Sequence, residues 1–275
     1  MERWLILLLL LLPGTALAEP ECLPRYPTPA STAAMFDVAQ ATAETLDALD
    51  DVDVVLLARG GQDLSKYGLR HSHVAFAVRE DDGQWRTLHL LNKCKSSTSA
   101  LYREGLGNFI GETGTHTDLR VGVPSPELRE ALKSILGGDG AQAKALHQPR
   151  YSAVAYPFST KYQNSNQWVL EVLMAGIKLA DSGRSVTYRG QAQAWLKTYR
   201  YQPSILHIGL GKRLGARFFA DNATTVDHPG TERVSGNYSV VTVESVFDFL
   251  YQHDLLVEET SVAHVPVTGM AAPQP

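Results

Sequence analysis

The chain has 275 residues, of which 44% are hydrophobic and 20% are charged, and its formal net charge is -4. This is the composition of an ordinary globular protein. The acidic balance argues against nucleic acid as the main partner, because phosphate binding requires clustered excess lysine and arginine.

The first 18 residues predict a secretory signal peptide. Arg3 precedes an apolar run over residues 4–12, and the small residues Ala16-Leu17-Ala18 complete the pattern of a cleavage site. The run is shorter than the roughly 20 residues of a membrane-spanning helix, so an uncleaved tether is the weaker alternative. We therefore expect an exported protein, periplasmic or secreted, with no integral membrane span after cleavage.

The mature chain would keep two cysteines, Cys22 and Cys94. In an oxidising compartment such a pair favours a disulfide, which for so long a loop contributes about 4 kcal/mol in the chain-entropy model. The alternative is a nucleophilic Cys94, because the flanking Lys93 and Lys95 favour a thiolate. An exported free thiol needs protection from oxidation, so we expect the disulfide.

The first half of the chain predicts a mixture of helices and strands. Apolar spacing predicts a helix over residues 31–50 and a strand over 53–59, whose continuous apolar run indicates burial on both faces. Residues 101–110 are typical of a short helix or compact loop, and residues 116–123 of a strand. Ser125 then starts a helix, because a capping serine is followed by proline at the first helical position.

Two histidines are predicted to lie on neighbouring strands. Alternation in the strand over residues 70–79 places His73 and Ala75 on one face, so a small side chain leaves room beside the imidazole. A tight turn then leads to a partner strand over residues 85–91, which carries His89. The sequence therefore brings the two imidazoles onto one sheet.

This histidine pair has three interpretations. His73 and His89 are either two half-buried side chains satisfied by their neighbours, or a metal pair that His71 would join, or a base and the partner that orients it. No third and fourth metal ligand with suitable spacing follows. We therefore expect neither a metal nor another cofactor.

The second half of the chain centres on Ser165. A polar run ends there, and apolar residues recur at helical spacing from Trp168 until Gly183 closes the helix. A serine or asparagine at this point is the ordinary N-cap, which accepts from orphan backbone N–H groups. The same place suits a nucleophile, because a helix N-terminus stabilises developing negative charge.

Amide side chains surround this serine, and they predict hydrogen bonding to a ligand: Gln163, Asn164, Asn166 and Gln167. Further on, residues 191–199 predict a helix and residues 240–253 a strand followed by a helix. His228 lies in a predicted turn, where a catalytic role has no support from the residues around it. The last residues, 259–275, predict a disordered tail.

The order of a strand histidine, a polar residue on the next strand and a nucleophile at a helix start resembles the circularly permuted papain-like superfamily. This superfamily includes NlpC-type and lecithin retinol acyltransferase-like proteins. The residues that carry the resemblance are Ser72-His73-Val74-Ala75-Phe76-Ala77-Val78, His89 and Asn164-Ser165.

Most of the chain also resembles a secreted proteobacterial family of unknown function. The residues that carry this second resemblance are Tyr67-Gly68-Leu69-Arg70, His89-Leu90-Leu91-Asn92-Lys93-Cys94, Gln163-Asn164-Ser165-Asn166-Gln167-Trp168, Arg213-Leu214-Gly215-Ala216-Arg217 and Asp227-His228-Pro229. It implies a family without an established activity.

The superfamily resemblance implies an α+β fold, in which an antiparallel sheet packs on a central helix and additional helices surround this papain-like core. Residues 19–258 would form this single domain, ending in a helical extension. It also implies Ser165, His73 and His89 as the catalytic residues.

The superfamily nucleophile is normally cysteine, and here serine stands in its place. A hydroxyl needs a general base where a thiol is readily deprotonated. We therefore expect either a Ser–His amide or ester hydrolase or acyltransferase, or an inactive envelope protein that uses the same cleft for binding or as a scaffold. Its ligand would be a peptide, a cell-wall fragment or a lipid-like molecule.

Overall fold

The computed structural model describes residues 28–60, 64–94, 96–111, 119–211, 213 and 222–262. Its elements are α1 (Pro29–Asp47), β1 (Val54–Arg59), the 3₁₀ helix η1 (Ser65–Tyr67), β2 (His73–Arg79), β3 (Trp85–Asn92), β4 (Ser99–Gly105), α2 (Leu106–Gly111), β5 (Leu119–Pro124), α3 (Pro126–Leu136), α4 (Ala141–Ala145), α5 (Ser165–Ser182), α6 (Arg189–Thr198), β6 (Ser204–His207), α8 (Gly230–Ser235), β7 (Asn237–Val240), α9 (Val243–Gln252) and β8 (Leu256–Val262).

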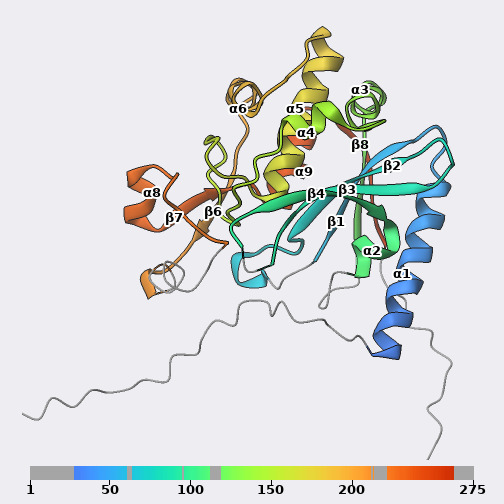
Figure 1. Cartoon of the computed structure of the whole chain (residues 1–275), viewed down its shortest axis with the longest axis horizontal. Coiled ribbons are helices and arrows are strands. Elements are labelled where there is room, and N and C mark those ends of the chain that lie inside the picture. The colour runs from blue at the N-terminus through green and yellow to red at the C-terminus, as the bar shows by residue number, and fades with distance from the viewer. Residues whose placement is uncertain are drawn as a thin grey trace, which may run out of the picture.

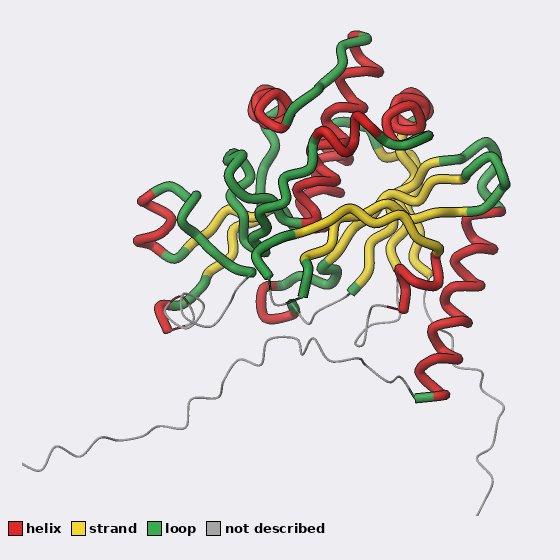
Figure 2. Tube along the Cα trace, in the orientation of Figure 1, coloured by secondary structure: helices red, strands yellow, loops and turns green. Residues whose placement is uncertain are grey.

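A six-stranded sheet lies at the centre, in the order β4-β3-β2-β1-β5-β8. Every pair of neighbouring strands in it is antiparallel. Helices α3, α5 and α9 lie on one side of this sheet and α1 and α2 on the other (Figure 1). Figure 2 shows the same arrangement, with the small β6–β7 sheet beside the main one. The predicted α+β class, with an antiparallel sheet packed on a central helix, is confirmed.

Strand alternation divides the interior into two apolar cores. Val74 and Phe76 face the core beneath α5, whereas Ala75 and Ala77 face the core beneath α1 and α2. Every residue of β1 is buried, which confirms the predicted burial on both faces. Because side chains alternate along a strand, His73 shares the face of Ala75 and points toward α2.

Helix α5 is the central helix, and neighbouring residues in the sequence fix where it begins and ends. The Asn164 side chain accepts from the N–H of Gln167, and Gly183 adopts a left-handed conformation with φ 65° at the C-terminal end. Gly176 permits close packing on α3, because a Cβ there would meet Leu128 Cδ1 and Leu132 Cδ2 at 2.9 Å. Gly176 therefore permits the close approach of α5 to α3 at this point.

Two expectations are wrong. Residues 259–262 form the end of β8, an edge strand paired with β5, so the tail does not begin at residue 259 and the chain returns to the sheet after α9. Residues 101–110 are predicted to form a short helix or compact loop, but residues 101–105 belong to β4, and the short helix α2 begins only at Leu106. Pairing with β3 overrides the weak local pattern there.

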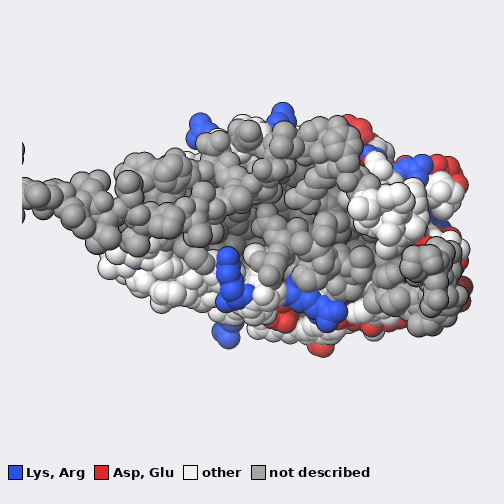
Figure 3. Space-filling model, turned by 90° about the horizontal axis from the view of Figure 1, so that it is seen from below, with Lys and Arg blue, Asp and Glu red and all other residues white. Residues whose placement is uncertain are grey.

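The proposed signal peptide, Cys22 and residues 263–275 lie outside the described residues. The predicted Cys22–Cys94 disulfide therefore stays a prediction. Within the part of the chain that is described, no helix is long and apolar enough to cross a membrane. On the face drawn in Figure 3, the visible Lys and Arg side chains are scattered.

Candidate active site

Ser165 and His73 line one cavity of about 600 Å³, called here the Ser165 cavity. It lies where the starts of α5 and β2 approach the β6–β7 sheet, whose Leu206 and Val240 line the opposite part. Asn164 and Asn166 also line it. Tertiary folding thus places His73 and Ser165, which are 92 positions apart in the chain, along the same cavity.

His73 is the first member of a buried hydrogen-bonded chain. Its Nε2 lies 2.8 Å from Nδ1 of His89, and Nε2 of His89 lies 2.9 Å from Oε1 of Glu104. An ionised carboxylate only accepts, so His89 donates from Nε2 and, when neutral, accepts at Nδ1. His73 then donates from Nε2, and its Nδ1 is left as the basic nitrogen. This tautomer is the one that a general base requires.

Glu104 is the member of this hydrogen-bonded chain that the sequence does not predict. It lies on β4, which pairs with β3 so that His89 stands opposite Tyr102. Glu104 lies two residues further along and on the same face as Tyr102. The only sequence signal is the alternation of residues 99–105, which is too short to distinguish a strand from a helix.

The two imidazoles are held neutral by their surroundings. Burial lowers the pKa of His73 well below its usual range, and the charges of Arg59 and His89 act in the same direction. Burial and the Arg59 charge lower the pKa of His89 to about 3. The Glu104 carboxylate accepts from His89 and favours the charged form of this imidazole, which opposes the lowering of its pKa. A neutral His73 is able to accept a proton.

Arg59 and Phe109 enclose the histidine pair on the α2 side. The Phe109 ring lies 5.9 Å from the ring of His73 and 5.3 Å from that of His89, between centroids. Arg59 lies over the same ring at 4.6 Å, and its Nη1 donates to the Phe109 carbonyl. In the described part of the chain, no group of three His, Cys, Asp or Glu side chains is placed to hold a metal ion.

Ser165 is the first residue of α5, not its cap. Asn164 is the N-cap, and its Oδ1 accepts from the Gln167 N–H at 2.7 Å. The cap interpretation of Ser165 is therefore wrong, because the residue before it already performs that role. Burial raises the pKa of Tyr151, and a hydrogen bond with the Ser165 side chain acts in the opposite direction. Tyr151 is thus a neutral phenol beside Ser165, and it is no base.

Asn166 holds the helix start against the strand start. Its Oδ1 accepts from the N–H of Val74 at 3.1 Å, and its Nδ2 donates to the carbonyl of Ser72 at 3.3 Å. These are the two neighbours of His73 in the chain. Asn166 therefore sets the position of the backbone that carries the imidazole relative to Ser165. No hydrogen bond joins Ser165 and His73 themselves among the contacts of the described residues.

Gln163 and Gln167 do not line the cavity. Nε2 of Gln163 donates to Glu171 at 2.7 Å and to the Leu146 carbonyl at 3.0 Å. Nε2 of Gln167 donates to the Pro157 carbonyl at 3.1 Å. A buried amide needs such partners. Both glutamines therefore stabilise the fold and do not line the cavity, contrary to their predicted role in binding a ligand.

The side chain of Asn164 is engaged as well. Besides capping α5, its Nδ2 donates to the Val241 carbonyl at 3.2 Å. By contrast, the main-chain N–H groups of Ser165 and Asn166 make no hydrogen bond with any described residue. These two N–H groups belong to the first turn of α5, where no intrahelical acceptor exists.

His228 lies outside the Ser165 cavity. Its Nδ1 contacts Oε2 of Glu232 at 2.7 Å, and its Nε2 contacts the Val154 carbonyl at 2.6 Å. Both ring nitrogens are engaged, so the geometry supplies no catalytic role for this residue.

Comparison with known proteins identifies a family. A model of a family described as an uncharacterized protein conserved in bacteria (DUF2145) matches residues 45–250. No curated protein and no solved structure matches the chain. The matched segment contains His73, His89, Glu104 and Ser165, and it covers most of the sequence. The chain therefore belongs to this bacterial family.

Proposed function

We propose that this protein is an exported Ser–His hydrolase or acyltransferase that acts on an amide or ester, on a core like that of the permuted papain-like superfamily. The observation that carries the proposal is the chain from Glu104 through His89 to His73, which ends at the cavity that Ser165 lines. A purely structural histidine pair needs neither a tautomer set by a carboxylate nor an adjoining serine at a helix start.

Each residue has a defined role in this reaction. His73 accepts the proton of the Ser165 hydroxyl as Oγ attacks the carbonyl carbon of the substrate, and it later delivers that proton to the leaving group. His89 and Glu104 orient the imidazole and fix its tautomer. The N–H groups of Ser165 and Asn166 at the start of α5 donate to the oxyanion. Ser165 rotates from Tyr151 toward His73 when substrate binds.

A fluorophosphonate probe tests the nucleophile. We expect it to label the wild-type protein at Ser165, and we expect Ser165→Ala and His73→Ala to remove the label. Ser182→Ala is the matched control, because it removes a hydroxyl at the opposite end of the same helix, where it donates to the Lys178 carbonyl. Labelling that survives Ser165→Ala would contradict the proposal.

A second test restores the nucleophile of the superfamily. In Ser165→Cys, the helix N-terminus and His73 both favour the thiolate, so iodoacetamide should alkylate this cysteine faster than a free cysteine at pH 7. Adding His73→Ala should slow the reaction. An alkylation rate that does not depend on His73 would show that the two side chains do not act together.

A second candidate function rests on the surroundings of Ser165. Tyr151 lines the same cavity, and no hydrogen bond among the described residues joins Ser165 to His73, which suits a non-catalytic envelope protein that binds a peptide, cell-wall fragment or lipid-like ligand there. This alternative predicts no labelling by the fluorophosphonate, together with saturable binding of a peptidoglycan fragment. Turnover of that fragment, lost in Ser165→Ala, would exclude it.

A further inference from the structure

Among the described residues, strand β6 pairs with β7 alone and its other edge is open. The register places Ser204 opposite Val240 and Leu206 opposite Tyr238, and the Ile208 N–H donates to the Gly236 carbonyl at 2.8 Å. Hydrogen-bonded pairs alternate in an antiparallel ladder. The main-chain groups of Ser204 and Leu206 therefore face β7, whereas those of Ile205 and His207 face away from it. No described residue supplies a main-chain partner on that side.

The edges of the main sheet differ from this one. The edge strand β8 carries Glu258 and Glu259, and the opposite edge strand β4 carries Arg103 and Glu104. Charged side chains at an edge discourage pairing with another chain. Strand β6 has the sequence Ser-Ile-Leu-His and no such charge, and its Ile205 side chain is 60% exposed. This edge is therefore open to a further strand.

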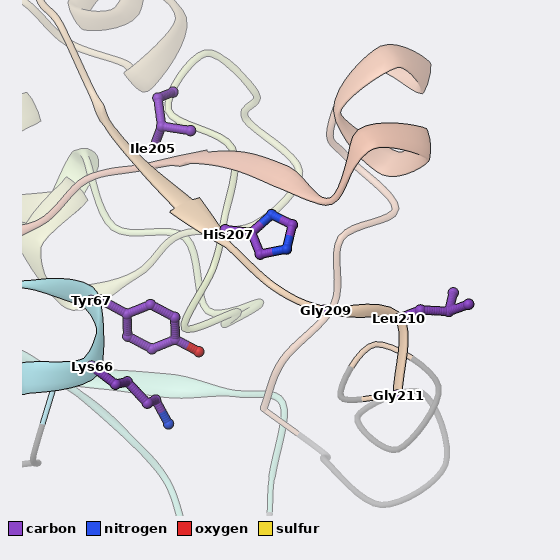
Figure 4. Close-up of a pocket in the computed structure, with 7 residues that line it drawn as sticks. All are labelled: Lys66, Tyr67, Ile205, His207, Gly209, Leu210 and Gly211. Carbon is purple, nitrogen blue, oxygen red and sulfur yellow. The ribbon is translucent and has the colours of Figure 1, made fainter.

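A second cavity of about 680 Å³, called here the β6 cavity, lies along this strand. Figure 4 shows Lys66 and Tyr67 projecting from η1 toward the space beside β6, where His207 and Gly209 also lie. Tyr67 lines this cavity and the Ser165 cavity as well. The two cavities thus adjoin, and β6 contributes to both.

The charged side chains that line the two cavities are positive. Among the described lining residues, Lys66 is the one Lys or Arg around the β6 cavity, and Arg59 is the one around the Ser165 cavity. Neither cavity has an aspartate or glutamate among its described lining residues. A ligand that carries a carboxylate is therefore favoured over a cationic one.

We propose that the open edge of β6 binds an extended polypeptide segment with an acidic residue, which adds a strand beside β6. The N–H and C=O groups of Ile205 and His207 pair with the main chain of this segment. The acidic side chain lies in the β6 cavity near Lys66, and the segment continues toward the Ser165 cavity. This binding does not depend on Ser165 acting as a nucleophile.

The test uses a fluorescein-labelled peptide of alternating threonine and valine that ends in aspartate, and fluorescence anisotropy with the full chain. We expect saturable binding that weakens about tenfold in Ile205→Pro, because the variant lacks one main-chain donor. An edge strand tolerates proline where its N–H faces solvent. Ile205→Thr is the matched control that keeps the N–H, and Lys66→Gln should weaken only peptides with the aspartate.

A second measurement uses only the wild-type protein, so it does not depend on the folding of a variant. The same peptide, N-methylated at alternate amides, loses the donors that would face β6 and should bind at least about tenfold more weakly. Equal binding of the methylated peptide, or no saturable binding up to about 1 mM, overturns the proposal. A wild-type dimer that becomes monomeric in Ile205→Pro also overturns it, because a second copy then occupies the edge.

Discussion

Two buried polar clusters lie on opposite sides of the sheet, and they differ in how completely their groups are satisfied. On the α5 side, the Glu171 carboxylate accepts from Arg189 at 2.7 and 2.9 Å, from Gln163 at 2.7 Å and from Gln193 at 2.9 Å. On the α2 side, the chain from Glu104 ends at His73, which lines a cavity.

The two clusters differ in whether packing alone satisfies their buried polar groups. The Glu171 cluster is closed, because its carboxylate oxygens have donors from three side chains, and it joins α5 to α6. The histidine cluster is open at one end, because the described residues give Nδ1 of His73 no hydrogen-bond partner and His73 lines a cavity. Perturbed histidines beside a cavity are candidates for chemistry, whereas a fully paired ion cluster is sufficiently explained by packing.

The largest effect is expected from opening the closed cluster. Glu171→Ala leaves the buried Arg189 guanidinium without its carboxylate, and we expect the free energy of unfolding to fall by about 3–5 kcal/mol. Urea denaturation measures this change. Asp181→Ala is the control, because it removes an exposed partner of Lys178 near the end of the same helix and should change stability far less. Equal effects of the two variants would contradict the distinction.

The open cluster should make stability depend on pH. The folded-state pKa of His89 falls from 6.5 to about 3, and that of His73 is lowered as well. A histidine with a lowered folded pKa stabilises the protein fully above its unfolded value near 6.5, and this contribution is lost as the pH falls toward the folded value.

We therefore expect the free energy of unfolding to decrease below pH 6.5 by up to about 1.4 kcal/mol per pH unit for each histidine. Denaturation between pH 7 and about pH 5 measures the slope. His89→Gln should reduce it, and an unchanged slope in this variant would show that His89 does not titrate in this way.

Glu104→Gln tests whether the open cluster acts in the reaction. The amide no longer selects one tautomer of His89, so we expect labelling by the fluorophosphonate to slow by at least about tenfold. The free energy of unfolding should change by less than about 1.5 kcal/mol, because a hydrogen bond is still possible. A large loss of stability with an unchanged labelling rate would assign Glu104 to structure instead.

Tyr151→Phe should have the smallest effect. It removes the phenol hydroxyl beside Ser165 and keeps the ring, so we expect a change in stability of about 1 kcal/mol or less. Labelling should continue at the wild-type rate or faster, because Ser165 then rotates toward His73 more readily. A complete loss of labelling in a folded variant would make Tyr151 part of the reaction.

Much of the local structure follows from the sequence alone. Alternation predicts that His73 lies on the face of Ala75, and the predicted strands bring His89 beside it, where the imidazoles hydrogen-bond. The helix that starts at Ser165 and is closed by Gly183 follows from apolar spacing and a left-handed glycine. These features depend on residues a few positions apart, so a single sequence contains them.

The assignment of the amides to the site or to the scaffold was decided only by tertiary structure. Gln163 and Asn166 look alike in sequence, yet one bonds to Glu171 inside the helical layer and the other holds the start of β2. Glu104 joins His89 only because β4 pairs with β3. Hydrogen-bond partners that are distant in the sequence satisfy these side chains, and only long-range packing brings those partners within hydrogen-bond reach. The sequence by itself determined the helix that starts at Ser165, the strands β1, β2, β3 and β5 and the pair of histidines, and the fold determined which polar groups remain open toward a cavity.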